Sequence, residues 1–159
     1  MLWLRESCLL TLITTLIRLK FSDVTQMTIV EFAQELENAT QPQPLILDVR
    51  GEAEYAVSHL TEAKRMDVSS DLTISDALKN VAKDTQIVLY CSVGYRSAKV
   101  AQQLQQAGFQ DVFNLEGGLF HWANEGRPIV HAGQLTQFVH PYRAVWGMLL
   151  KKQYRFQEK

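Results

Sequence analysis

A short turn, residues 91–97 (CSVGYRS), constrains the fold more than any other segment, because it joins a strand-like run to a helix-like run. Residues 87–89 form a continuous apolar stretch, which is typical of a parallel strand buried on both faces. Residues 97–107 carry apolar side chains at helical spacing, and Gly108 is a usual helix terminator. This order predicts an α/β fold with the turn at the carboxyl end of a parallel sheet.

The residues of the turn suit an anion-binding loop around a reactive cysteine. Gly94 permits a backbone conformation that other residues resist, and Ser97 is expected to cap the helix that follows. Free amide N–H groups of such a turn, with the positive end of the helix, point toward its centre. Cys91 lies at the edge of this centre, where the helix end and Arg96 favour its thiolate. An inert core cysteine is the alternative, but it would not require a glycine-containing turn that an arginine closes.

The spacing between the cysteine and the arginine narrows the chemistry. Four residues separate Cys91 from Arg96. Cysteine phosphatases also hold a thiolate in an anion-binding loop closed by arginine, but they place one residue more between the two. The tighter loop leaves less room for a tetrahedral phosphate beside the nucleophile. Phosphatase activity is therefore the less favoured chemistry, and release of phosphate from aryl phosphates would reveal it.

Three segments of the chain resemble the sequence motifs of the rhodanese-type sulfurtransferases. The turn at 91–97 is similar to the active loop of that family, and the family's first and closing signatures have counterparts on either side of it. These counterparts are 48–50 (DVR), 54–55 (EY), 59–60 (HL), 114–118 (NLEGG), Trp122, Gly126 and Pro128. The resemblance covers about residues 24–130.

The resemblance implies a rhodanese-like α/β domain over residues 23–130, with a central parallel β-sheet flanked by helices and extra helical segments at both ends. It implies a sulfurtransferase that moves sulfane sulfur from thiosulfate or a persulfide to a thiophilic acceptor through a persulfide on Cys91, without a cofactor. Cys91 and Arg96 are then the catalytic residues. The loop residues expected to bind the substrate are Ser92, Val93, Gly94, Tyr95 and Ser97. The residues expected to support the loop structurally are Asp48, Arg50, His59, Gly117 and Gly118.

The loop and the first signature depart from the family in two places. A second basic residue near the start of the loop often accompanies thiosulfate use in the family, and Ser92 stands there instead, so a persulfide-carrying protein is the alternative donor. Ser92 and Tyr95 are expected to point toward the mouth of the site. The family commonly places Pro-Gly where this chain has Thr61-Glu62, so the turn into a strand around residues 63–68 is expected to differ.

The rest of this domain alternates between helix-like and strand-like patterns. Thr28 followed by Glu31 is a capping-box pattern, which predicts a helix over residues 28–37. Apolar runs predict further strands at 45–47 and 111–115. Further predicted helices are 52–58, 73–82 and 119–125. Strands that alternate with helices again favour a parallel sheet.

Charge is unevenly distributed along the chain. The formal net charge of −1 gives no argument for nucleic-acid binding. Residues 21–126 hold 15 acidic and 7 basic residues, whereas residues 127–159 hold 1 and 6, and residues 1–20 hold 1 and 3. The basic ends are expected to approach an acidic partner or an anionic membrane, or to form solvated helix faces.

The cysteines and histidines limit the remaining functional classes. The two cysteines, Cys8 and Cys91, are too few for a disulfide framework, and a working thiolate fits a reducing compartment. We therefore expect a cytoplasmic protein, or one peripheral to a membrane. The histidines are scattered without Cys or acidic partners at ligand spacing, so no metal site is expected. The expected partner is a small anionic sulfur donor or a persulfide-carrying protein, and not a nucleic acid.

Residues 1–22 form an N-terminal extension with the pattern of an amphipathic helix. Its apolar run, residues 8–17, is too short to span a bilayer. On a helix, leucines and isoleucines at 9, 12, 13, 16 and 17 share one side, and polar residues at 7, 11, 14, 15 and 18 share another. The extension is expected either to pack on the domain or a partner, or to attach to a membrane surface. It could instead be a signal peptide, or precede a translation start at Met27.

Residues 131–159 form a basic C-terminal extension. Residues 140–154 are predicted to form a helix that begins at Pro141 and carries its basic residues at its end. Such a helix fits a membrane surface, a partner groove or the domain itself. These extensions support an alternative function, a rhodanese-like binding or regulatory module that recruits a membrane or protein partner through its ends.

Overall fold

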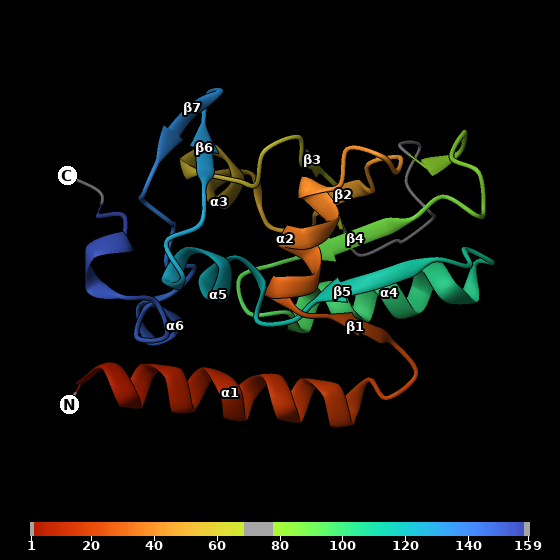
Figure 1. The fold of residues 1–159 in the computed structure, drawn as a ribbon. Helices are drawn as coiled ribbons and strands as arrows, with labels where there is room; N and C mark the ends of the chain where they lie inside the picture. The colour runs from red at the N-terminus through yellow and green to blue at the C-terminus, as the bar shows by residue number, and fades with distance from the viewer. Residues whose placement is uncertain (1, 69–77, 158–159) are drawn as a thin grey trace.

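A five-stranded parallel sheet organises the chain in the computed structural model, which describes residues 2–68 and 78–157 (Figure 1). The strand order is β1-β5-β4-β2-β3, and every pair of neighbours is parallel. The strands are β1 (Thr25–Met27), β2 (Leu45–Asp48), β3 (Lys64–Arg65), β4 (Ile87–Tyr90) and β5 (Val112–Leu115). All residues of the central strand β4 are buried, as its continuous apolar run predicted. The predicted α/β fold is confirmed.

Helices cover both faces of this sheet. On one face, α2 (Ile29–Glu37) and α5 (Gly118–Asn124) contribute to one hydrophobic cluster, and on the other α4 (Tyr95–Gln106) contributes to a second. A short helix, α3 (Glu52–Val57), follows β2. The capping box at the start of α2 is present, with the Glu31 N–H donating to the Thr28 hydroxyl at 3.2 Å. Half of the predicted helix 73–82, residues 73–77, lies outside the described residues; residues 78–82 form turns and not an α-helix, so that part of the prediction is wrong.

The N-terminal extension forms a long helix, α1 (Leu2–Lys20), that packs along the domain (Figure 1). Leu10 belongs to the first hydrophobic cluster and Ile17 to the second, so the helix contributes to both. The buried face coincides only in part with the predicted apolar side: Ile17 is buried, but so are Leu10 and Thr14, whereas the leucines at 9, 12, 16 and 19 are 43–70% exposed. The surface against which the helix packs decides which of these side chains is covered. No helix in the described part of the chain is long and apolar enough to cross a membrane.

The single C-terminal helix predicted over residues 140–154 is wrong. The chain instead forms a hairpin of β6 (Ile129–His131) and β7 (Gln134–Thr136), a short helix α6 (Ala144–Gly147) and a 3-10 turn η2 (Lys152–Tyr154). Long-range hydrogen bonds replace those of a helix here: the Asn124 side chain donates to the Leu149 carbonyl and accepts from the Lys151 N–H, both at 2.8 Å. These bonds hold the segment where Leu149 and Leu150 are buried against the domain.

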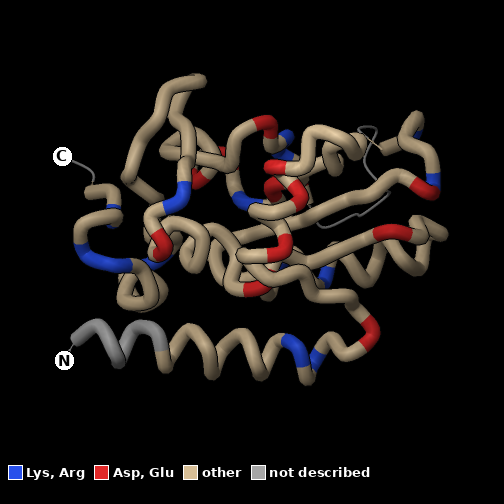
Figure 2. Tube along the Cα trace, in the orientation of Figure 1, with Lys and Arg blue, Asp and Glu red and all other residues tan. Residues whose placement is uncertain are grey.

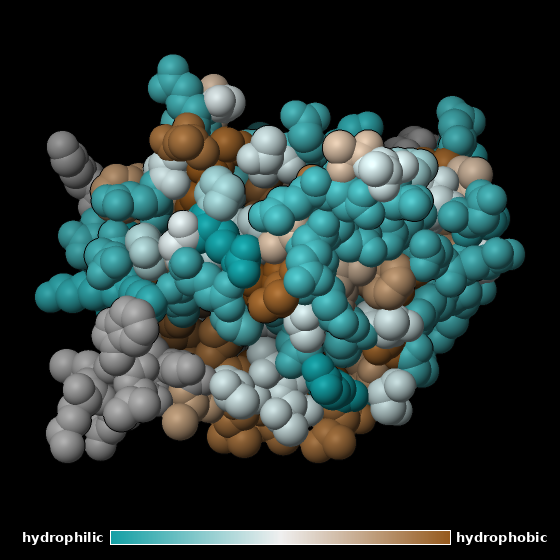
Figure 3. Space-filling model, viewed as in Figure 1, coloured by the Kyte–Doolittle hydropathy of each residue, from teal (hydrophilic) through white to brown (hydrophobic). Residues whose placement is uncertain are grey.

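Charge and apolar surface are both uneven on the folded chain. Lys and Arg positions occur at the end of α1 and in the C-terminal segment, and acidic positions are spread over the sheet and its loops (Figure 2). Exposed apolar side chains gather along the lower edge of the molecule in Figure 3, where α1 lies in Figure 1. The two extensions therefore supply much of both the basic and the exposed apolar surface.

Candidate active site

The predicted loop lies at the carboxyl end of β4, directly before α4. Gly94 is the residue before the helix and has a left-handed backbone (φ 101°), which turns its N–H toward the sulfur of Cys91 at a distance of 3.1 Å. The first N–H groups of α4 have no carbonyl partner within the helix and face the same loop. Cys91 is only 1% exposed, yet it lines a cavity of about 460 Å³. The sulfur is thus held at the bottom of an accessible cavity.

The expectation that Ser97 caps the helix is wrong. Helix α4 begins at Tyr95, so Ser97 lies within its first turn and is fully buried. Its hydroxyl finds no hydrogen-bond partner among the described residues. The helix starts earlier because the left-handed Gly94 ends the loop by itself, and no side-chain cap is needed at that point.

Arg96 is bound to a carboxylate that the sequence analysis did not assign to the site. Its guanidinium donates to both oxygens of Glu54, at 2.9 and 2.8 Å, and to the hydroxyl of Ser92 at 3.0 Å. Ser92 in turn donates to Glu54 at 3.1 Å, so its hydroxyl is turned toward this carboxylate, although the residue lines the cavity. Glu54 is placed by the start of α3, where it accepts the Gly51 N–H at 3.0 Å. The Glu-Tyr pair of the first signature was the available signal for it.

The pKa values of Glu54 and Arg96 are shifted by burial and by the charges around the two side chains. Burial acts to raise the pKa of Glu54, but the hydrogen bonds and charge of Arg96 outweigh it and leave the pKa below its ordinary value. Burial likewise acts to lower the pKa of Arg96, and Glu54 together with the negative charge of a Cys91 thiolate raises it instead. The guanidinium also lies 4.3 Å from the ring centroid of Tyr142, from the C-terminal extension. The guanidinium of Arg96 therefore stays protonated, and the carboxylate of Glu54 offsets much of its positive charge.

Asp48 and Arg50 form a fully buried ion pair beneath the loop. The Arg50 guanidinium donates to Asp48 at 2.6 Å and to the carbonyl of Ser58 at 2.6 Å. In the sheet Asp48 lies beside Tyr90, the residue that directly precedes Cys91. Arg50 thus connects two segments next to the loop. One is the end of β2, which pairs with β4, and the other is the end of α3, the helix that carries Glu54. This position fits the predicted supporting role, and the pair is not a surface one.

Gly117 and Gly118 bring the start of α5 against the loop. Both have left-handed backbones, and a Cβ on Gly118 would lie 2.4 Å from the carbonyl oxygen of Cys91. The next two N–H groups donate to the loop, from Leu119 to Cys91 at 2.8 Å and from Phe120 to Ser92 at 3.0 Å. A side chain on Gly118 would collide with the loop, and one on Gly117 would collide with His121, so neither position has room for a Cβ.

Other predicted residues lie farther from the sulfur. His59 stacks on Tyr55 at 3.9 Å and pairs by backbone hydrogen bonds with Val130, which fits a structural residue. Glu62, in the place where the family commonly has glycine, adopts a left-handed backbone (φ 62°). Asn114, which was not predicted as a site residue, is buried, and its side-chain amide donates to the Gly94 carbonyl at 3.1 Å. Within the described ranges, no group of three His, Cys, Asp or Glu side chains could hold a metal ion.

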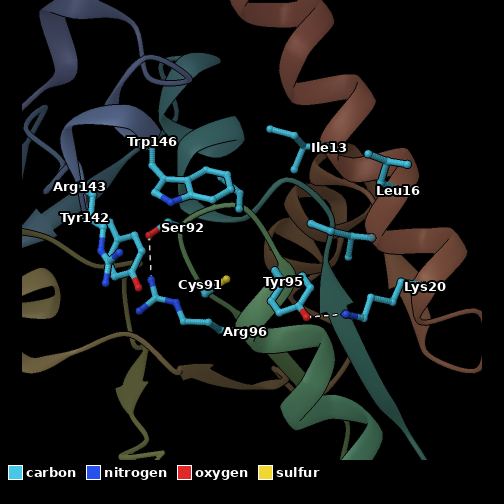
Figure 4. A pocket seen from close by; sticks show the side chains of 12 residues that line it. Ile13, Leu16, Lys20, Cys91, Ser92, Tyr95, Arg96, Tyr142, Arg143 and Trp146 are labelled. Atoms are coloured by element: carbon cyan, nitrogen blue, oxygen red, sulfur yellow. Dashed lines mark hydrogen bonds between the residues drawn. The ribbon is translucent and has the colours of Figure 1, made fainter.

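The cavity above Cys91 has a polar floor and an apolar roof (Figure 4). We call Cys91, Ser92, Arg96 and their partner Glu54 the floor. The roof consists of Ile13, Leu16 and Ile17 from α1 with Tyr142 and Trp146 from the C-terminal extension. Tyr95 stands at the side, where its hydroxyl accepts a hydrogen bond from Lys20 at 2.7 Å. The roof was not predicted, because it joins opposite ends of the chain.

The fold and the floor define a class of protein, α/β domains that present a cysteine at the carboxyl edge of a parallel sheet in a loop leading into a helix. The family model described as "Rhodanese-like domain" matches residues 29–125. The chain belongs to this family. Both extensions, including every roof residue, lie outside the matched segment.

Individual relatives agree with this assignment. A "Sulfurtransferase" of Allochromatium vinosum is 35% identical over 86 residues, which is 54% of this chain and 78% of the relative. A "tRNA uridine(34) hydroxylase" of Sodalis glossinidius is 35% identical over 95 residues, which is 56% of this chain and only 26% of that protein. A crystal structure of a "Rhodanese-like Domain Protein" from Staphylococcus aureus is 30% identical, with a TM-score of 0.55 over 71% of this chain and 97% of that one. The sulfurtransferase and hydroxylase names both support a catalytic role, and the chain spans only about a quarter of the length of the hydroxylase.

Proposed function

We propose that the protein transfers sulfane sulfur through a persulfide on Cys91. The observation that carries this proposal is the position of the Cys91 sulfur, which accepts the Gly94 N–H at the N-terminal end of α4 and lines an accessible cavity. An N–H donor and the N-terminal end of a helix stabilise negative charge, including that of a persulfide sulfur. The sulfurtransferase name of a relative agrees with this chemistry.

The reaction is a double displacement. In the first step the Cys91 thiolate attacks the outer sulfur of the donor, the donor's bond to that sulfur breaks, and the leaving group departs with the electron pair. With thiosulfate the leaving group is sulfite; with a persulfide it is a thiolate. In the second step a thiophilic acceptor attacks the outer sulfur of the Cys91 persulfide and restores the thiolate.

Arg96 contributes positive charge beside the loop and holds it in shape. Because its guanidinium is bound to Glu54 and Ser92, it supports the loop that carries Cys91 as well as attracting an anionic donor. The partial neutralisation by Glu54 weakens the attraction for a dianion such as thiosulfate. A persulfide donor, which carries less charge, is therefore the donor that we favour.

Intact mass after exposure to a sulfane donor tests the proposal. We expect a gain of one sulfur atom that cyanide removes, and no gain in Cys91→Ala. The exposed Cys8 provides the matched control, because Cys8→Ala is expected to keep the gain. Absence of the adduct with both thiosulfate and persulfide donors would refute the proposal, and release of phosphate from aryl phosphates would support phosphatase chemistry in its place.

A second function is favoured by the exposed face of α1. The leucines at 9, 12, 16 and 19 recur at helical spacing and are 43–70% exposed, and Arg18 and Lys20 stand at the same end of the helix as Leu19. We propose that this face lies on an anionic lipid surface, where the leucines enter the interface; Arg18 and Lys20, which also bind Glu116 and Tyr95, lie at its end. The two functions are compatible, because Leu9, Leu12 and Leu19 lie outside the cavity lining and only Leu16 belongs to both this face and the roof.

Sedimentation with vesicles that contain anionic lipid tests the second function. The double substitution of Leu12 and Leu19 by serine is expected to lower the bound fraction at least about tenfold, because two large apolar side chains no longer enter the interface. Val30→Ser is the matched control, since Val30 is similarly exposed (52%) on α2. Equal binding of the double variant and the wild type, or no binding of the wild type, would refute a lipid role for this face.

A further inference from the structure

The roof of the cavity is unexpected for a site that handles only small anions. Side chains of α1 and of the C-terminal extension converge above the sulfur, with Ile13 and Leu16 on one side and Trp146 on the other (Figure 4). Both segments lie outside the family match at residues 29–125 and come from opposite ends of the chain. The chain thus adds an apolar enclosure to the family's loop.

Two of the three described cations that line this enclosure, Arg96 and Lys20, bind polar protein groups, and the third, Arg143, lies 5.5 Å from the Tyr142 ring centroid. Arg96 is bound to Glu54, and its face is covered by the ring of Tyr142 at 4.3 Å. The Lys20 amine donates to the Tyr95 hydroxyl at 2.7 Å and lies 4.9 Å from that ring centroid. A small, strongly hydrated anion would lose water on entry and meet mainly hydrocarbon. An apolar molecule would instead bury surface against the roof.

We propose that the cavity binds the apolar body of an organic thiol, which accepts the sulfur from Cys91. This inference rests on the proposed sulfur transfer and specifies the acceptor for it. The volume of about 460 Å³ lies within the range of small-molecule sites, roughly 300–1,000 Å³. Cys91 is at the floor and only 1% exposed, so an acceptor that reaches its sulfur must occupy the space below the roof.

The transfer step balances without another reactant. The acceptor thiolate R–S⁻ attacks the outer sulfur of the Cys91 persulfide, and a new S–S bond forms in the product R–S–SH. The bond between the outer sulfur and Sγ breaks, and its electron pair stays on Sγ. Cys91 is left as the thiolate that the Gly94 N–H already stabilises, at 3.1 Å.

Chain-length dependence of the acceptor tests the inference directly. The persulfide form of the full chain is discharged with n-alkanethiols of two to six carbons, which differ little in acidity. Each buried methylene is expected to raise the second-order rate constant about three- to fourfold, so the hexyl compound should react roughly 100-fold faster than the ethyl compound. Equal rate constants for all the thiols would overturn the inference. If Cys91 still gains a sulfur atom that cyanide removes, the proposed function stands.

Two roof variants and one matched control locate the effect. Trp146→Ala removes the largest roof side chain, and Ile13→Thr replaces a roof side chain by a smaller one that carries a hydroxyl. Both are expected to lower the hexyl-to-ethyl ratio, by roughly tenfold for Trp146→Ala. Val145→Ala, next to Trp146 but 60% exposed and outside the cavity lining, should keep the wild-type ratio. Unchanged ratios in both folded roof variants would also overturn the inference.

A second measurement examines the cavity without sulfur transfer. Alkyl methanethiosulfonates convert a thiolate to a mixed disulfide and release methanesulfinate, and peptide mapping in Cys8→Ser protein reports the reaction at Cys91 alone. The hexyl reagent is expected to outpace the methyl reagent with the intact roof and to lose that advantage in Trp146→Ala. A retained advantage without any persulfide formation would refute the proposed function and the acceptor role, while leaving an apolar binding site. Equal rates would overturn the site itself.

Discussion

The floor and the roof of the cavity are built on different physical principles. The floor is held by directional bonds: Arg96 donates to both Glu54 oxygens, and Gly94 donates to the sulfur of Cys91. The roof is held mainly by apolar packing of α1 and the C-terminal extension against the domain, where Leu10 and Leu149 share one hydrophobic cluster, and Asn124 adds two hydrogen bonds to the extension. The difference suggests a division of labour, in which the floor fixes the reacting sulfur and the roof selects what approaches it.

The difference between floor and roof also predicts which substitutions the protein tolerates. A hydrogen-bonded, buried charge has one acceptable arrangement, because a lost partner leaves an unpaired group. An apolar surface accepts many side chains of suitable size. We therefore expect substitutions in the floor to cost more stability than substitutions that loosen the roof, and the following predictions test that order.

The largest effect is expected where the floor meets α5. Gly118→Ala places a Cβ 2.4 Å from the Cys91 carbonyl oxygen at a residue with φ 56°, and should lower the free energy of unfolding by about 4 kcal/mol. Gly108→Ala is the matched control, since its backbone is also left-handed (φ 92°) but nothing lies near its Cβ; it should cost about 1 kcal/mol. Urea unfolding measures both, and equal costs would contradict crowding at the loop.

The next effect concerns the charge pair in the floor. Arg96→Ala leaves the Glu54 carboxylate buried without its main partner, and should lower the free energy of unfolding by about 3 kcal/mol. Arg18→Ala removes an exposed ion pair with Glu116 and should cost less than about 1 kcal/mol. Chemical denaturation of the two variants compares them. Similar costs would mean that Glu54 finds another partner when Arg96 is absent.

A smaller effect is expected in the support of the roof. Asn124→Ala removes two hydrogen bonds to the C-terminal extension, to the Leu149 carbonyl and from the Lys151 N–H, and should cost about 1–2 kcal/mol in chemical denaturation. The loosened extension should also reduce the preference for long alkanethiols. Asn38→Ala removes exposed local bonds to Thr40 and should cost less than about 1 kcal/mol. An Asn124→Ala cost above that of Arg96→Ala would break the proposed order.

The smallest effect is the pH dependence of the floor. The pKa of Glu54 in the folded protein lies below its ordinary value of 4.5, so the folded state binds this proton less readily than the unfolded chain. Its contribution to stability is therefore present above pH 4.5 and is lost as the pH falls through the folded pKa. The stability difference between wild type and Glu54→Gln should shrink as the pH falls from about 6 to about 3 in thermal unfolding. A constant difference would contradict this assignment.

Local patterns predicted much of the fold and part of the site. The apolar run before Cys91, the capping box at Thr28 and the glycines at 117 and 118 each express a local requirement of the backbone, and each has the predicted place in the structure. Ser97 was misassigned because the helix begins two residues earlier, where a glycine in a left-handed conformation ends the loop without a side-chain cap.

Partners that are far apart in sequence could not be predicted in the same way. Glu54 reaches Arg96 across 42 residues, and Lys20 reaches Tyr95 across 75. The C-terminal path is decided by the side chain of Asn124, which competes with helical hydrogen bonds at Leu149 and Lys151. No local pattern contains this information.

The amino-acid sequence by itself determined strands β2 to β5, helices α2 to α5 and the loop that presents Cys91, because backbone preferences and apolar periodicity act over a few neighbouring residues. Only the tertiary structure decided which face of α1 is buried, which carboxylate binds Arg96 and what stands above the sulfur. These depend on the free energy of packing distant segments together, which is a property of the whole chain.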